Sequence, residues 1–150
     1  MNPLHVYDYE DLYRSVRPGE YKTMDGKVII SASAFNDRER KPSVDRAWLD
    51  RDFKDIRKSP SDGITMLIAR EVRSNSTVET FDGKGRKIRQ HTVDVMHRPI
   101  INYPEEPDNP AHCQIECDPA LETDSTFKRL KEALAGLATR VGFIVSPDSA

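Results

Sequence analysis

The stretch STFKRLKEALAGLATRV, residues 125–141, decides the fold class because it has the pattern of an amphipathic helix. Its large apolar residues recur three or four positions apart: Phe127, Leu130, Leu134, Leu137 and Val141. A helix with one apolar stripe must bury that stripe against another layer of structure. We expect Asp124 or Ser125 to cap the helix and Gly142 to end it. The sequence therefore predicts an amphipathic C-terminal helix near 125–141 that packs on a partner layer.

Strand patterns upstream supply that layer. KVIISASAF, residues 27–35, ends in a period-two alternation, and ITMLIAREV, residues 64–72, is the nearly continuous apolar run of a central strand. Residues 77–95 contain two alternating runs around Asp82-Gly83-Lys84-Gly85, which is typical of a hairpin. We expect one α+β domain over residues 1–150, with a mixed or mainly antiparallel sheet.

A second helix is predicted near residues 44–57, after Pro42. Its apolar positions have helical spacing: Val44, Trp48, Leu49, Phe53 and Ile56. A helix N-terminus attracts anions, and an arginine can add a bidentate clamp. Ser43, Asp45 and Arg46 are therefore candidate ligand-binding residues. The alternative is purely structural: Ser43 caps the helix, and Asp45 favours its first turn.

PDNPAHCQIEC, residues 107–117, holds a histidine, a glutamate and both cysteines of the chain. In a strand, His112, Gln114 and Glu116 share one face, and Cys113 and Cys117 share the other. The two cysteines then lie about 13 Å apart, which is too far to share a metal ion. We expect no metal site. The sequence leaves open whether His112 is a functional residue or fixes the preceding proline-rich loop.

Charge and hydropathy limit the partners. Lys+Arg 23 against Asp+Glu 25 gives a net charge of -2, so only a local patch could contact nucleic acid. The candidate patch is the hairpin at 84–89, with Lys84, Arg86, Lys87 and Arg89. No stretch has the ~20 apolar residues of a membrane span, and the N-terminus lacks a signal-peptide pattern. We expect a cytoplasmic protein that needs no cofactor, and the sequence does not define its oligomeric state.

Three short motifs resemble those of ADP-ribosyltransferases, in the order arginine, serine, glutamate. They are Tyr13-Arg14, Ser31-Ala32-Ser33 and Gln114-Ile115-Glu116, with Ser-Ala-Ser standing where that family has Ser-Thr-Ser. The resemblance implies an enzyme that uses NAD as its cofactor. Arg14 would hold the NAD phosphates, Ser33 would shape the nicotinamide pocket, and Glu116 would engage the ribose.

A broader resemblance is to a family of small uncharacterised bacterial proteins. It rests on three segments of this chain: Ser31 to Phe35, Ser43 to Arg46 and Asn109 to His112. The resemblance implies that residues in these segments belong to one shared pattern, without choosing between catalysis and recognition.

The favoured hypothesis is a small cytosolic bacterial binding or accessory protein. It would recognise a partner protein, or an anionic ligand, through a surface around Ser43, Arg46 and His112. The competing hypotheses are an NAD-using enzyme with Arg14, Ser33 and Glu116 in one cleft, and nucleic-acid contact through the basic hairpin. The binding and enzyme hypotheses differ in one testable respect: only the enzyme hypothesis requires Arg14, Ser33 and Glu116 to lie close together in space.

Overall fold

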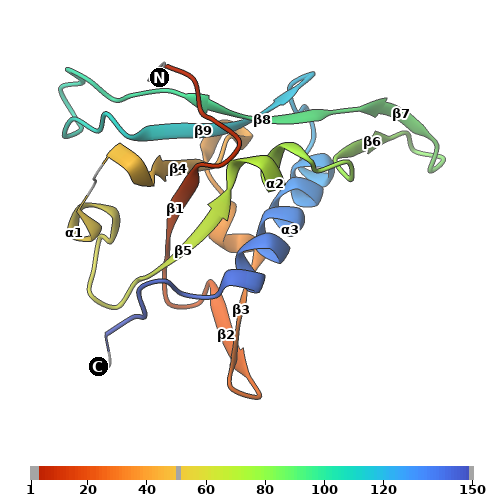
Figure 1. Ribbon diagram of the computed structural model, residues 1–150. Helices are drawn as coiled ribbons and strands as arrows, with labels where there is room; N and C mark the ends of the chain where they lie inside the picture. The colour runs from red at the N-terminus through yellow and green to blue at the C-terminus, as the bar shows by residue number, and fades with distance from the viewer. Residues whose placement is uncertain (1–3, 50–51, 149–150) are drawn as a thin grey trace.

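A computed structural model describes residues 4–49 and 52–148, and it has an α+β fold (Figure 1). Five antiparallel strands form a sheet in the order β5-β1-β4-β9-β8. These strands are β1 (Asp11–Val16), β4 (Ser43–Arg46), β5 (Gly63–Ile68), β8 (Thr92–His97) and β9 (His112–Asp118). The predicted fold class, with a mainly antiparallel sheet, is confirmed.

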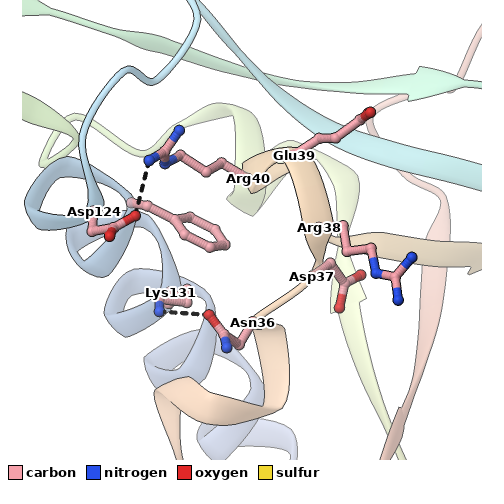
Figure 2. A pocket seen from close by; sticks show the side chains of 8 residues that line it. Asn36, Asp37, Arg38, Glu39, Arg40, Asp124 and Lys131 are labelled. Atoms are coloured by element: carbon pink, nitrogen blue, oxygen red, sulfur yellow. Dashed lines mark hydrogen bonds and ion pairs between the residues drawn. The ribbon is translucent and has the colours of Figure 1, made fainter.

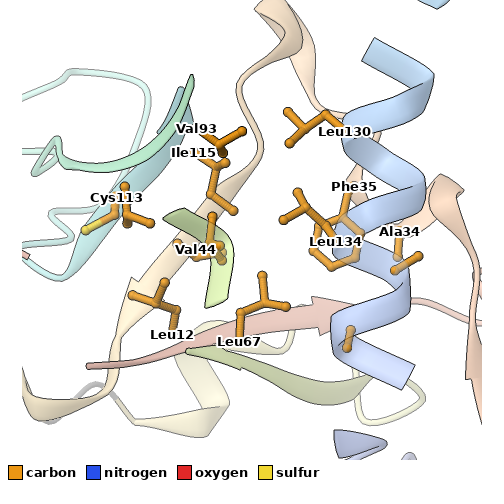
Figure 3. Packing of buried hydrophobic residues seen from close by; sticks show 14 of the residues in the cluster. Leu12, Ala34, Phe35, Val44, Leu67, Val93, Cys113, Ile115, Leu130 and Leu134 are labelled. Carbon is orange, nitrogen blue, oxygen red and sulfur yellow. The ribbon is translucent and has the colours of Figure 1, made fainter. Parts of the chain in front are cut away.

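The C-terminal helix α3 (Asp124–Val141) packs on one face of this sheet, and its prediction is confirmed. Figure 3 shows Leu130 and Leu134 of α3 pointing toward the sheet residues Val44, Leu67 and Ile115. Full burial of a leucine stabilises a fold by about 1.5–3 kcal/mol. The apolar stripe of α3 is therefore a major source of the stability of this domain.

The N-cap of α3 differs from the expectation. Thr123, and not Asp124 or Ser125, occupies this position, and its side chain accepts a hydrogen bond from the backbone N–H of Thr126. At the other end Gly142 has φ 77, a left-handed conformation that glycine adopts without steric cost.

The predicted helix near 44–57 is wrong. Ser43–Arg46 forms strand β4, followed by a 3-10 turn, η3 (Ala47–Leu49), and one short turn of helix, α1 (Phe53–Ile56). Residues 50 and 51 of the predicted helix lie outside the described residues. Strand β4 is hydrogen-bonded between β1 and β9, and this long-range pairing overrides the local helical spacing.

The run ITMLIAREV is also not one central strand. Its first part belongs to β5, at the edge of the sheet, and its second part forms α2 (Ala69–Arg73). The free side of β5 is partly covered by a bridge between Ile64 and Val145. Gly63 lies directly against the ring of Phe143, so its lack of a side chain permits this approach.

The remaining elements are short. Strand β2 (Tyr21–Met24) pairs with β3 (Lys27–Ile30), and the predicted hairpin is β6 (Glu79–Phe81) with β7 (Lys87–Gln90). Two 3-10 turns, η1 (Ala32–Phe35) and η2 (Arg38–Arg40), lead from β3 to β4. The predicted strand KVIISASAF therefore ends at Ile30. Within the described ranges, no helix has the length and hydropathy required to cross a membrane.

The two faces of the sheet have different environments. Val44, Cys113 and Ile115 point toward the core under α3. The cross-strand partners Ser43 and Gln114, and Asp45 and His112, point to the opposite side, together with Glu116. We call these five residues the open face, because each of them is partly exposed.

Candidate binding surface

Ser43 and His112 converge on the open face, as the sequence predicts. The Nε2 atom of His112 lies 3.0 Å from Oγ of Ser43, and its Nδ1 lies 2.7 Å from the carbonyl oxygen of Arg98. A carbonyl oxygen only accepts hydrogen bonds, so Nδ1 carries a proton, and Nε2 is left to share a hydrogen bond with the serine hydroxyl. Beside this pair, the side-chain amide of Asn109 donates to Asp45 over 2.8 Å.

A serine hydroxyl bonded to an imidazole is also the arrangement of a nucleophile and its base. Acyl transfer further needs N–H donors aimed at the developing oxyanion. The backbone N–H of Ser43 already donates to Asp37 over 2.6 Å, so it is not available for this purpose. What the Ser43–His112 pair does in this structure is to link β4 to β9 and to the start of the loop at residues 98–111.

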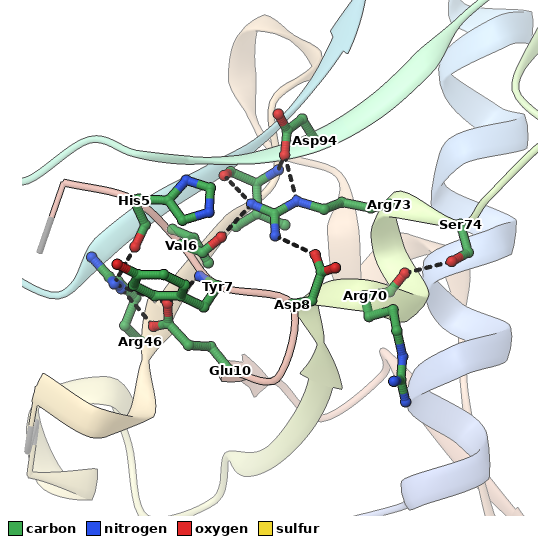
Figure 4. Close-up of polar contacts among 11 residues, drawn as sticks. His5, Val6, Tyr7, Asp8, Glu10, Arg46, Arg70, Arg73, Ser74 and Asp94 are labelled. Carbon is green, nitrogen blue, oxygen red and sulfur yellow. Dashed lines mark hydrogen bonds and ion pairs between the residues drawn. The ribbon is translucent and has the colours of Figure 1, made fainter. Parts of the chain in front are cut away.

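Arg46 does not belong to this surface, which corrects its predicted role as an anion clamp. It lies on the core side of the sheet with an exposed fraction of 0%. Its guanidinium group forms an ion pair with Glu10 at 2.7 Å and donates to the carbonyl oxygen of His5 at 2.8 Å (Figure 4). Because a buried and paired arginine cannot reach an external ligand, Arg46 has a structural role.

Arg46 also influences the adjacent histidine. Nδ1 of His97 lies 3.2 Å from the Arg46 guanidinium. Burial, followed by the positive charge of Arg46, lowers the pKa of His97 below 6.5. This histidine is consequently neutral at pH 7.

A second arginine, Arg73 of α2, also holds the N-terminal segment, residues 4–10. Figure 4 shows its guanidinium group between Asp8 and Asp94, to which it forms ion pairs of 2.8 and 2.7 Å. Val6 of the same segment is buried in the core. The segment is therefore held by packing, by two arginines and by backbone hydrogen bonds from Ala69 and Arg70 to the carbonyl oxygens of Glu10 and Asp8.

Five large apolar or aromatic side chains are exposed in the segments around the buried Arg46–Glu10 ion pair. They are Tyr9, Trp48, Phe53, Ile101 and Tyr103, and we call them the aromatic end. Arg46 connects three of the segments that carry them, because it binds Glu10, lies 4.9 Å from the ring centre of Trp48 and donates its backbone N–H to the Ala111 carbonyl oxygen. Figure 1 shows α1 and the loop between β8 and β9 on the same side of the molecule.

Acidic side chains surround the aromatic end. Glu105, Glu106 and Asp108 are exposed on the loop that carries Tyr103, and Asp52 is exposed beside Phe53. Arg98, at the base of this loop, is already paired with Glu116 over 2.9 Å. Lys54 is exposed on the other side of Phe53. This side of the molecule therefore presents apolar rings within a rim in which exposed carboxylates outnumber exposed cations.

The residues expected for an NAD site do not converge. Arg14 faces the α3 side of the sheet, where Asp37 binds it at 2.6 and 2.7 Å and the carbonyl oxygen of Ala34 accepts from it. Glu116 lies on the open face, and Ser33 is an exposed residue of η1. Burial opposes ionisation of Asp37, but Arg14 and the Ser43 N–H outweigh it and lower the Asp37 pKa. The guanidinium group of Arg14 is thus engaged in hydrogen bonds within the fold.

The two cysteines behave as core residues, as strand parity predicts. Burial raises the pKa of Cys113 to about 12 and that of Cys117 to about 11, so both remain protonated thiols. Among the described residues, no group of three or more His, Cys, Asp or Glu side chains has a geometry that could hold a metal ion.

The basic hairpin carries little net positive charge. Its four cationic side chains are exposed, but three form ion pairs: Arg86 with Asp82, Lys87 with Glu79 and Arg89 with Glu122. Neighbouring carboxylates therefore cancel most of the field that would attract a polyanion.

Comparison with known proteins gives no assignment: no family model, no curated protein and no solved structure matches the chain. Sequence reasoning missed Glu10, Arg73 and His97, and it interpreted Trp48 as one of the apolar positions of a helix. The pattern around Trp48 gave no sign of its exposure, because apolar spacing alone does not show which face is covered.

Proposed function

We propose that this is a cytosolic protein that binds a partner protein through the aromatic end. The observation that carries the proposal is the exposure of Trp48, Phe53 and Tyr103. Polar contacts hold the segments of Trp48 and Tyr103, and a ring contact to Tyr13 holds that of Phe53. Large exposed apolar areas mark interaction sites, and tryptophan and tyrosine are frequent energetic centres of interfaces.

The support beneath these rings favours binding. Arg46 contacts Trp48 from the core side, and the ring of Phe53 packs edge-on against Tyr13 with centroids 5.4 Å apart. The bond from Asn109 to Asp45 fastens the loop that carries Tyr103. Side chains that are already positioned lose less conformational entropy on binding. The aromatic end is thus organised before a partner arrives.

Charge defines the class of partner. Glu105 and Glu106 are exposed and form no ion pair within the described residues. An acidic rim attracts a basic surface and disfavours an acidic one. We therefore propose a partner with an apolar patch surrounded by lysines or arginines.

The test compares capture of proteins from an extract of the native host by immobilised wild type and by single-site variants. Trp48→Ala and Tyr103→Ala should each reduce capture of the same basic partner by about tenfold or more. Ile88→Ala is the matched control, because Ile88 is 61% exposed and Tyr103 is 60% exposed. Raising the salt concentration should also weaken capture.

Equal capture by wild type, Trp48→Ala and Tyr103→Ala would contradict the proposal. Recovery of a second copy of this chain as the only bound protein would contradict it too, because the surface would then be a self-association interface. Unchanged melting temperatures of the variants serve as the folding control.

A further inference from the structure

A pocket of about 470 Å³ lies on the α3 side of the sheet, away from the open face. The segment from Asn36 to Arg40 forms one wall, and Asp124, Phe127 and Lys131 of α3 form the other. Figure 2 shows Arg40 bonded to Asp124 and Lys131 bonded to Asn36, while Glu39 points away from both pairs. A volume of roughly 300–1,000 Å³ is usual for sites that hold small organic ligands.

The charges of the lining leave an excess of positive potential. Arg38, Arg40 and Lys131 face three acidic side chains, but Asp37 is neutralised by Arg14 from outside the pocket. Asp124 is 94% exposed and touches Arg40 through one contact of 2.9 Å. A ligand anion could replace this solvated carboxylate without leaving it buried and unpaired. Asp124 also begins α3, so the positive end of the helix dipole adjoins the site.

Arg40 provides an unused donor. Its Nε atom is buried and has no hydrogen-bond partner among the residues that the structure describes. Buried N–H groups are nearly always bonded, so an unbonded one indicates a missing acceptor. The guanidinium fork suits an oxyanion that can accept two parallel hydrogen bonds.

The backbone also positions Arg40 under strain. Glu39 and Arg40 have φ angles of 61° and 57°, which are left-handed values that residues with a side chain seldom adopt. Strained backbone of this kind is concentrated at binding and catalytic sites. Here it accompanies the placement of Arg40 beside the first turn of α3.

We propose that this pocket binds the phosphate group of a small phosphorylated molecule between Arg40 and Lys131. Lys131 is held near the site by Asn36, whose side-chain oxygen accepts from it over 2.9 Å. The phosphate supplies acceptors to the exposed part of the Arg40 guanidinium and to the lysine ammonium. The rest of the pocket accommodates an organic group attached to the phosphate. The site is separate from the aromatic end and does not depend on its proposed function.

The test follows backbone amide NMR shifts of the full chain during titration at constant ionic strength. The probes are inorganic phosphate and ribose 5-phosphate, with ribose as the uncharged control. Saturable shifts should appear near residues 38–41 and 124–127. Arg40→Gln and Lys131→Gln should each weaken binding at least about tenfold, because each removes a charge-assisted hydrogen bond. Lys128→Gln is the matched control, since Lys128 is an exposed lysine of α3 outside the pocket.

Tighter binding of ribose 5-phosphate than of inorganic phosphate supports a phosphorylated organic ligand, whereas equal binding would overturn that part of the proposal. Shifts that do not saturate would overturn the site itself. So would an equal loss of affinity in Lys128→Gln, because the effect would then reflect general surface charge.

Discussion

At the scale of single residues, Arg46 organises the polar structure behind the aromatic end. It binds Glu10, the His5 carbonyl oxygen and His97, and its guanidinium group lies against Trp48. Its burial was not predictable from the sequence, because its main partner lies 36 positions away. The period-two pattern of residues 112–117, in contrast, correctly predicted that the two cysteines face the core and that His112 faces the opposite side.

Replacing Arg46 with leucine should therefore destabilise the protein by about 3–5 kcal/mol, because the buried Glu10 carboxylate loses its partner. Urea unfolding at pH 7 measures this change. The double variant Glu10→Leu/Arg46→Leu is the control and should be more stable than Arg46→Leu alone. A loss below about 1 kcal/mol for Arg46→Leu would show that the ion pair is not essential.

Asp37 should make stability depend on pH. Its pKa in the folded protein is lower than 3.8, so the folded state holds this proton less tightly than the unfolded state. The stabilisation is fully present above pH 3.8 and is lost as the pH falls through the folded-state pKa. Asp37→Asn should therefore cost about 1–2 kcal/mol at pH 7.

Urea unfolding of wild type and Asp37→Asn at pH 7, pH 5 and pH 3 measures this dependence. The difference between the two proteins should persist at pH 5 and narrow at pH 3. A difference that stays constant over this range would mean that the Asp37 charge does not stabilise the fold.

At the scale of secondary-structure elements, local patterns predicted α3 but not β4. The stripe runs from Phe127 to Val141 of the 18-residue helix α3, and the first turn of the helix has a side-chain cap. β4 has only four residues, and its strand conformation depends on hydrogen bonds to β1 and β9. Such pairings are invisible in the apolar spacing around Val44, so that spacing suggested a helix.

The cap of α3 gives a prediction at this scale. Thr123→Ala should destabilise the protein by about 1 kcal/mol, because the hydroxyl that accepts from the Thr126 N–H is lost. Ser125→Ala is the control and should cost only a few tenths of a kcal/mol, since Ser125 does not occupy the N-cap position. Thermal unfolding compares the stabilities of the two variants. A larger loss of stability for Ser125→Ala than for Thr123→Ala would contradict the assignment of Thr123 as the N-cap.

At the scale of the whole molecule, the order of the strands brings together segments that carry the aromatic end. Strand β1 lies between β4 and β5, and β4 lies between β1 and β9. This arrangement places the N-terminal segment, η3 and the loop at 98–111 around Arg46. Sequence reasoning placed Ser43, Arg46 and His112 on one surface, and only Ser43 and His112 lie together there. It could not predict an arrangement that depends on strands far apart in the chain.

The central claim is that the aromatic end contacts another protein, and site-specific photocrosslinking in living cells tests it most directly. A photoreactive amino acid placed at Tyr103 should give one discrete adduct with a basic partner. The same group placed at Ile88 should not give that adduct, although the two positions are equally exposed at 60% and 61%. Identical adduct patterns from both positions, or no adduct at Tyr103, would contradict the account.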